Sequence, residues 1–198
     1  MNKNFIQITK DFICFPLLFF ISHDAARKLG ITSLQDERFN VCMPFLSGNV
    51  LDVGCGKDNN FIKRIGYGVG IDPYFSDGTN MRVKAEDMDF GDKSFKTITM
   101  MGTLRYIKNR QKAMEQLSRV LDDDGFLLVL ENHPLMNMVR HALIKWWNPY
   151  VGMEDVIGMK KKDIELLANG NNFMIIATIR YVYGLSVMYV LMKKTITP

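Results

Sequence analysis

Two short stretches in the first half of the chain combine glycine with an acidic residue at a spacing that suits a nucleoside-bearing cofactor. The stretch Leu51–Gly56 (LDVGCG) runs from an apolar segment into a Gly-x-Gly turn. Glycine at such a turn lets the main chain approach a ligand where a side chain would clash, and the start of a following helix attracts a negative group. Asp72 ends the next apolar segment, 20 residues after Asp52, where a carboxylate can accept both hydroxyls of a ribose.

Two common nucleotide-binding motifs are incomplete at this turn. The dinucleotide motif G-x-G-x-x-G requires a third glycine at position 59, which is Asn59. The phosphate-binding P-loop requires Ser or Thr after Gly-Lys, whereas Gly56-Lys57 is followed by Asp58. The residues therefore indicate a cofactor that carries a nucleoside, without identifying it further.

Short apolar segments alternate with helical patterns between Asn49 and Asn132. Strands are expected at Val50–Val53, Gly68–Ile71, Thr97–Met101 and Phe126–Leu130. Short, continuously apolar strands are typical of a parallel sheet that is buried on both faces, and their alternation with helices predicts helices on both of those faces. Ligands of such sheets bind beyond the carboxyl ends of the strands, so the residues that follow the first three strands are expected to line the site.

The elements flanking these strands are also readable in the sequence. Asn109–Leu121 has apolar residues on one face and polar residues on the other, which predicts an amphipathic helix, and Gly125 is expected to end it in a left-handed conformation. A second helix is predicted at Lys161–Asn169. Phe173–Tyr183 and Ser186–Met192 are rich in β-branched and aromatic residues, and they predict two neighbouring antiparallel strands.

Five ordered motifs resemble those of the class I S-adenosylmethionine-dependent methyltransferases, in particular the small-molecule, ubiquinone-type branch. They are Leu51–Gly56, Gly70–Asp72, Phe90–Phe95, Leu104–Ile107 and Arg119–Gly125, within about Asn49–Glu131. The resemblance implies an α/β fold with a Rossmann-like, doubly wound sheet of seven strands, mostly parallel with an antiparallel strand near the C-terminus. It also implies an enzyme that transfers a methyl group from S-adenosylmethionine by in-line displacement.

The resemblance further implies which residues bind S-adenosylmethionine. These are Asp52, Gly54, Cys55 and Gly56 around its methionine part, Asp72 on its ribose, Pro73 and Tyr74 beside its adenine, Glu86, Asp87 and Met88 at the adenine edge, and Met101 and Gly102 under the sulfonium. Three positions depart from the family pattern. Asp58 replaces the third glycine of the first motif, Lys84 aligns with the usual adenine-binding acid, and Lys96 replaces the acid that usually follows Ser94-Phe95.

Methyl transfer needs a base only if the acceptor arrives protonated. His133, just past the fourth expected strand, could accept a proton near neutral pH, and Tyr106 is a second candidate, although both side chains could instead serve the local structure. No metal site is expected, because Cys14, Cys42 and Cys55 are scattered without metal-ligand spacing. The scattered cysteines also favour a reducing compartment, so the protein is expected in the cytoplasm.

Composition and length limit the remaining options. With 198 residues, 47% hydrophobic and 23% charged, the chain fits one globular domain, and a net charge of +4 is too small to predict nucleic-acid binding. We expect a cofactor-binding core at 49–131 and C-terminal strands at 173–192. An N-terminal cap at 1–40 and an insertion at 132–155, with the aromatic cluster Trp146–Tyr150, would together shape the acceptor pocket.

Phe12–Ile21 is an unbroken apolar run of ten residues, too short for a membrane-spanning helix, which needs about 20. It could pack onto the domain and roof the active site, or it could bind a membrane surface or a greasy substrate. A signal-peptide core is a third interpretation. With Trp146–Tyr150, the run favours a small or lipid-linked methyl acceptor. An RNA or protein methyltransferase, and a relative that binds the cofactor without turnover, are the alternatives.

Overall fold

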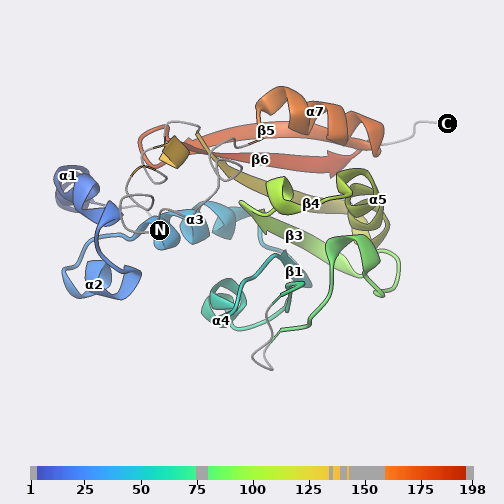
Figure 1. Ribbon diagram of the computed structural model, residues 1–198, viewed down its shortest axis with the longest axis horizontal. Helices are drawn as coiled ribbons and strands as arrows, with labels where there is room; N and C mark the ends of the chain where they lie inside the picture. The colour runs from blue at the N-terminus through green and yellow to red at the C-terminus, as the bar shows by residue number, and fades with distance from the viewer. Residues whose placement is uncertain (1–3, 75–79, 134–135, 139–141, 143–158, 195–198) are drawn as a thin grey trace.

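The computed structural model describes residues 4–74, 80–133, 136–138, 142 and 159–194. Six strands of these residues form one sheet in the order β2-β1-β3-β4-β6-β5 (Figure 1). Their bounds are β1 (Val50–Val53), β2 (Val69–Ile71), β3 (Phe95–Met101), β4 (Leu121–Asn132), β5 (Phe173–Tyr181) and β6 (Ser186–Lys193).

The sheet is mostly parallel, as predicted. β1 pairs in parallel with β2 and β3, and β3 pairs in parallel with β4. β6 is antiparallel to both β4 and β5, so one antiparallel strand near the C-terminus is confirmed. The described residues contain six strands where seven were predicted, and beside β2 an isolated parallel bridge joins Ile71 to Met81.

Helices cover both faces of the sheet. The α-helices are α1 (Phe5–Cys14), α2 (His23–Lys28), α3 (Leu34–Cys42), α4 (Asn60–Ile65), α5 (Arg110–Val120) and α7 (Lys161–Gly170). Short 3-10 helices are η1 (Phe15–Phe19), η2 (Met43–Phe45), η3 (Ala85–Asp87) and η4 (Leu104–Tyr106). α5 and α7 pack with η3 on one face, and α3 and α4 pack on the other.

Alternation along the central strands explains this two-sided core. In β4, Leu127 and Val129 belong to the cluster under α5 and α7, whereas Leu128 and Leu130 belong to the cluster under α3 and α4. Successive side chains of a strand point to opposite faces, and all four are buried. The strand is therefore continuously apolar because both of its faces are covered.

The predicted role of Gly125 is wrong. α5 ends at Val120 and β4 begins at the next residue, so Gly125 lies within a strand rather than at a helix terminus. A Cβ at Gly125 would lie 2.8 Å from the carbonyl oxygen of Lys96 on the neighbouring strand. Glycine is needed there because the two main chains approach closely, and a left-handed conformation is not involved.

The N-terminal helices α1 and α2 lie at one end of the molecule (Figure 1). The tip of the β5–β6 hairpin anchors this segment, because the ring of Tyr183 contacts the rings of Phe12 and Phe15 at centroid distances of 5.3 and 5.2 Å. Val182 and Tyr183 have φ angles of 49° and 55°, a conformation that is strained for a β-branched residue such as valine. No helix in the described part of the chain is long and apolar enough to cross a membrane.

Candidate active site

The loops after β1 and β2 are joined by hydrogen bonds at the carboxyl edge of the sheet. The N–H of Gly54 donates to the carbonyl oxygen of Ile71 at 2.8 Å. The carboxylate of Asp72 accepts from the N–H of Gly56 at 3.2 Å and from the N–H of Tyr74 at 2.9 Å. Asp72 therefore fixes the conformation of both loops that the sequence assigned to the cofactor.

Gly54 adopts a left-handed φ of +77°, and a Cβ there would lie 2.2 Å from Oγ1 of Thr103. The side chain of Thr103 thus fills the space that glycine leaves at this turn. Asp58, which replaces the third glycine of the family motif, is exposed to solvent. The helix that follows begins at Asn60, and its N-cap residue is Asn59 rather than Asp58.

A cavity of about 250 Å³ opens beside these loops. Five of the residues predicted for the site line it: Gly54, Pro73, Tyr74, Glu86 and Tyr106. Seven further lining residues were not predicted: Val53, Val83, Lys84, Ala85, Thr103, Ile107 and Lys108. We call it the cofactor cavity, since it combines apolar and aromatic walls with a carboxylate and lies at the strand ends where such sheets bind ligands.

Asp52 lies beneath the glycine turn and is 3% exposed. Burial raises the pKa of its carboxyl to about 6, although the hydrogen bond that it accepts from the Thr99 hydroxyl, at 2.6 Å, acts in the opposite direction. The side chain is thus held inside the fold next to the turn. Its contact with the methionine part of the cofactor stays a prediction.

Other predicted cofactor residues lie away from the cavity lining. Asp87 is exposed and pairs with Lys112 at 2.7 Å, and Met88 is buried in the core under α5. Cys55 is partly buried, and its thiol contacts the Asn80 amide nitrogen at 3.3 Å. Burial raises the pKa of the Cys55 thiol to about 11, so the thiol is protonated near neutral pH.

The predicted sulfonium position lies where β3 and β4 end side by side. Gly102 follows β3 with a φ of +73°, and its N–H donates to the carbonyl oxygen of Leu130 at 2.8 Å. A Cβ at Gly102 would lie 3.6 Å from the Arg105 guanidinium. Met101, the last residue of β3, packs against the core under α3 and α4.

Glu131 is a buried acid at this edge that was not predicted. It is 2% exposed, and neither carboxylate oxygen has a hydrogen-bond partner in the described part of the chain. Burial raises the pKa of Glu131 to about 7, against the opposing effect of the positive charges of Arg105 and Arg38. The sequence did contain a signal for this acid, because Glu131 directly follows the apolar segment Phe126–Leu130. The candidate base expected from the sequence was instead His133, two residues later.

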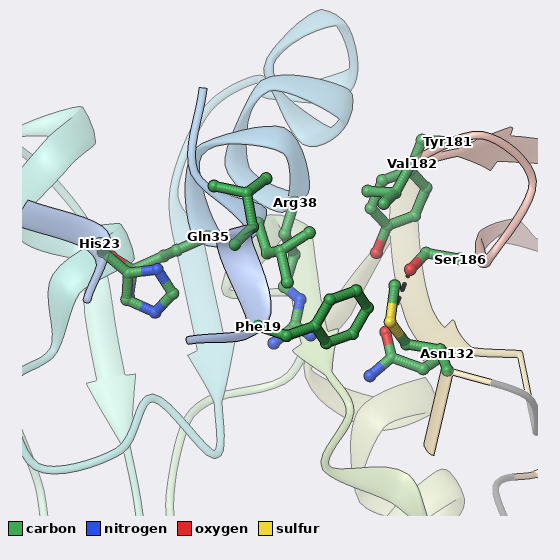
Figure 2. Close-up of a pocket in the computed structure, with 11 residues that line it drawn as sticks. Phe19, His23, Gln35, Arg38, Asn132, Tyr181, Val182 and Ser186 are labelled. Carbon is green, nitrogen blue, oxygen red and sulfur yellow. Dashed lines mark hydrogen bonds between the residues drawn. The ribbon is translucent and has the colours of Figure 1, made fainter. Parts of the chain in front are cut away.

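A second cavity, of about 300 Å³, lies between the N-terminal segment and the ends of β4, β5 and β6. Its lining residues are Leu18, Phe19, His23, Leu34, Gln35, Arg38, Asn132, Met136, Tyr181, Val182 and Ser186. In Figure 2, Arg38 and Phe19 lie between His23 on one side and Tyr181, Ser186 and Asn132 on the other. We call it the acceptor cavity, after the role that we propose for it below.

The polar groups of the acceptor cavity come from the strand ends and from α2 and α3. The Ser186 hydroxyl donates to the Asn132 side-chain oxygen at 3.1 Å. Burial raises the pKa of Tyr181 to about 12, so its hydroxyl stays protonated. Burial and the charge of Arg27 lower the pKa of His23, which favours a neutral imidazole. The described lining residues therefore present largely neutral polar groups and apolar side chains beside one cation, Arg38.

The two predicted catalytic candidates are placed differently. Tyr106 lines the cofactor cavity, with the Arg105 guanidinium 5.1 Å from its ring centroid. His133 is exposed and lines neither cavity, and its main-chain N–H donates to the carbonyl oxygen of Leu185 at 2.8 Å. The aromatic cluster at 146–150 lies outside the described residues. Within the described ranges, no group of three or more His, Cys, Asp or Glu residues could hold a metal ion.

The sheet order and the glycine turn define a Rossmann-like α/β protein that binds a nucleoside-bearing ligand at its strand ends. The comparisons with known proteins make this class specific. A family described as "Methyltransferase domain" matches residues 27–177, and the chain belongs to this family. No curated protein sequence matches the chain.

Solved structures share the fold at low sequence identity. A SAM-dependent methyltransferase from Thermotoga maritima is 16% identical with a TM-score of 0.63, covering 80% of this chain and 88% of its own. A SAM-dependent methyltransferase from Aquifex aeolicus is 14% identical with a TM-score of 0.58, covering 86% and 98%. One from Methanosarcina mazei is 18% identical with a TM-score of 0.53, covering 78% and 97%.

S-adenosylmethionine is the cofactor that this family assignment implies, and the cofactor cavity fits it. The walls include Pro73, Tyr74 and Tyr106, which suit a planar adenine because aromatic rings pack well against flat apolar surfaces. Asp72 follows β2 and directly precedes the lining residue Pro73, although Asp72 itself is buried and is not among the lining residues. Its binding of the ribose hydroxyls stays a prediction. The turn at Gly54 leaves the main chain accessible to the methionine part.

Proposed function

We propose that this methyltransferase acts on a small or lipid-linked, largely apolar acceptor that binds in the acceptor cavity. The observation that carries the proposal is the arrangement of the two cavities at the same edge of the sheet. One is lined by the residues after β1, β2 and β3, and the other by the ends of β4 and β5 and the start of β6. Gly102 follows β3, and Glu131 lies near the end of β4, the strand that pairs with β3.

The size and lining of the acceptor cavity support this substrate class. Its volume of about 300 Å³ is at the lower end of the range of roughly 300–1,000 Å³ for small-molecule sites. Leu18 and Phe19 supply part of its apolar wall, which supports the interpretation in which the Phe12–Ile21 run roofs the site. Asn132 and Gln35 supply side-chain amides that can orient a polar group of the acceptor.

Bound S-adenosylmethionine supplies an activated methyl group, so the chain itself has little covalent work to do. Its residues hold the acceptor nucleophile in line with the methyl group and exclude water, and orientation of this kind can supply about 7–11 kcal/mol of barrier lowering. Where the acceptor carries an O–H or N–H, we propose Glu131 as the group that takes up the proton, because it directly precedes Asn132, which lines the acceptor cavity. Glu131 itself is buried and is not among the described lining residues of either cavity. Its pKa of about 7 suits a base that works near neutral pH.

Transfer of a labelled methyl group into fractionated cell extract tests the proposal. The purified protein is incubated with methyl-labelled S-adenosylmethionine, and small molecules and lipids are then separated from RNA and protein. We expect label in the small-molecule or lipid fraction. Label in RNA or protein would replace the proposed acceptor by a macromolecule, and cofactor binding without any transfer would indicate a non-catalytic relative.

A further inference from the structure

The N-terminal helix α1 exposes apolar side chains along one face. The outer face of α1, which we define as Phe5, Ile6, Thr9, Phe12 and Ile13, recurs at the spacing of one helix surface. Its large side chains Phe5, Ile6 and Ile13 are 82%, 77% and 71% exposed. A shallow groove of about 410 Å³ runs along part of this face.

The inner side of the same helix is polar, which reverses the usual pattern of a helix that packs onto a protein core. Asp11 is 2% exposed, and its carboxylate accepts from the Thr32 N–H at 2.9 Å and from the Gln7 side-chain amide at 2.8 Å. The Gln7 amide also donates to the carbonyl oxygen of Gly30 at 3.1 Å. The helix is thus held to the chain through its polar side and through the contact of Phe12 with Tyr183, while Phe5, Ile6 and Ile13 are turned away.

Each polar side chain of α1 is hydrogen-bonded within the chain. Besides Gln7 and Asp11, Lys10 donates to the carbonyl oxygen of Leu29 at 2.7 Å, and the Thr9 hydroxyl donates to the carbonyl oxygen of Phe5 at 3.0 Å. A typical protein interface contains about one hydrogen bond per 100–200 Å². The outer face of α1 has almost no side-chain group that could form a hydrogen bond with a protein partner. A hydrocarbon environment requires no such groups, because it cannot form hydrogen bonds.

We propose that α1 lies in the plane of a lipid bilayer surface, with its outer face among the acyl chains. The one acidic residue of α1, Asp11, is turned inward, so no carboxylate of this helix meets the lipid headgroups. Among the described residues that line the groove, Lys10 alone carries a charge, and its ammonium group donates to the Leu29 carbonyl oxygen on the polar side of the helix. This is the arrangement of an interfacial amphipathic helix.

The lipid-binding segment continues directly into the acceptor cavity. After α1, Phe20 is a further exposed aromatic side chain, at 68% exposure, whereas Leu18 and Phe19 of the same segment line the cavity. Docking on a bilayer would therefore bring the cavity wall close to lipid-linked molecules. This last step rests on the proposed function, whereas lipid binding by α1 does not depend on it.

Sedimentation with lipid vesicles tests lipid binding without any methyl acceptor. The full chain is mixed with vesicles of phosphatidylcholine containing a minority of phosphatidylglycerol, and the bound fraction is compared between wild type, an Ile6→Ser/Ile13→Ser variant and a Leu166→Ser/Met174→Ser control. The control residues are 63% and 46% exposed on α7 and β5. We expect the wild type and the control to bind. The Ile6→Ser/Ile13→Ser variant should lose roughly tenfold in partition coefficient per substitution.

A fluorescence measurement locates the contact. The Ile6→Trp variant should show quenching of the new indole by lipids brominated in their acyl chains, in excess of the quenching of the natural tryptophans in the wild type. The proposal is overturned if the wild type stays in the supernatant at all lipid concentrations, or if binding is unchanged in Ile6→Ser/Ile13→Ser. It is also overturned if light scattering shows an oligomer that Ile6→Ser/Ile13→Ser dissociates, since a second copy would then cover this face.

Discussion

The side chain of Thr103 packs directly against Gly54, where any larger residue would place its Cβ. A Cβ at Gly54 would lie 2.2 Å from Oγ1 of Thr103. This contact joins the loop after β1 to the loop after β3. It brings together the first cofactor motif and a residue that follows the predicted sulfonium position, although the two are far apart in the sequence.

Gly54→Ala should therefore destabilise the protein more than an alanine at another left-handed glycine. Both glycines have a left-handed φ, +77° at Gly54 and +82° at Gly66. A Cβ at Gly66 would have nothing within 4 Å, whereas a Cβ at Gly54 would clash with Thr103. Gly66→Ala should cost about 1–2 kcal/mol for its backbone conformation alone, and Gly54→Ala about 1–3 kcal/mol more for the displaced side chain. Urea unfolding of both variants measures the difference, and equal losses would contradict the packing described.

The cofactor side of the site was predictable only in part from the sequence. Of the twelve residues that the resemblance implied, Gly54, Pro73, Tyr74 and Glu86 line the cofactor cavity and the other eight do not. Gly54, Pro73 and Tyr74 come directly after strand ends, so their position in the chain fixes their position in space. Met88 shows the limit of this reasoning, because it lies close in sequence to a lining residue but turns its side chain into the core.

The acceptor side was much less predictable, because its residues come from distant parts of the chain. Tyr181 and Ser186 face each other across the β5–β6 hairpin, but Asn132 joins them only when the sheet places β6 next to β4. Arg38 comes from α3, far away in the sequence. Neither a motif nor a periodicity marks these positions. Gly125 was misplaced for a related reason, since its close approach to Lys96 is a contact between strands that local turn rules do not describe.

Glu131 should lower stability at alkaline pH. Its folded pKa of about 7 lies above the usual value of 4.5, so the protonated form stabilises the fold at low pH and this contribution is lost as pH rises through about 7. Glu131→Gln should raise the free energy of unfolding at pH 8 by on the order of 2–3 kcal/mol and change it little at pH 5. Thermal unfolding at both pH values measures this.

The exposed Glu115 on α5 provides the control for that experiment. Glu115→Gln should leave stability nearly unchanged at both pH values, because a solvated carboxylate has no burial penalty. A loss of stability at pH 8 in Glu131→Gln would contradict the account, as it would mean that the carboxylate has stabilising partners. If Glu131→Gln gains stability and also transfers methyl groups more slowly, Glu131 has a functional role that lowers the stability of the fold.

Asp36 should have the opposite pH dependence. Its carboxylate accepts from the Ser33 hydroxyl and pairs with Arg27 at 2.9 Å and Arg64 at 2.6 Å, joining α2, α3 and α4. Burial alone would raise its pKa, but the hydrogen bonds and charges of these partners lower it below 3.8. This contribution is present above the unfolded pKa and is lost as pH falls through the lower folded value.

Asp36→Asn should therefore cost about 1–3 kcal/mol near neutral pH, and the difference from the wild type should shrink in acid. Guanidinium unfolding at pH 7 and pH 3 measures both effects. Asp24→Asn is the control, because Asp24 also pairs with Arg27 but has a side chain that is 82% exposed. If Asp24→Asn were as destabilising as Asp36→Asn, the central position of Asp36 between the three helices would be wrong.

Phe19 and Phe20 form a matched pair for testing the acceptor cavity. Phe19 lines the cavity, whereas its neighbour Phe20 is 68% exposed and does not. Phe19→Ala should lower the rate of label transfer into the small-molecule fraction at limiting acceptor by roughly tenfold, with cofactor affinity unchanged. With water-soluble acceptors, Phe20→Ala should match the wild type. Equal effects of both substitutions would place the acceptor elsewhere.

Calorimetric titration with S-adenosylmethionine tests the central claim most directly. The wild type should bind one equivalent, and Asp72→Ala should weaken binding by roughly 10- to 100-fold, because charged hydrogen bonds to the ribose hydroxyls and the support of the glycine loop are both lost. Asp58→Ala, which removes an exposed acid of the same loop, should bind like the wild type. Absence of binding by the wild type, or full affinity in Asp72→Ala, would contradict the account.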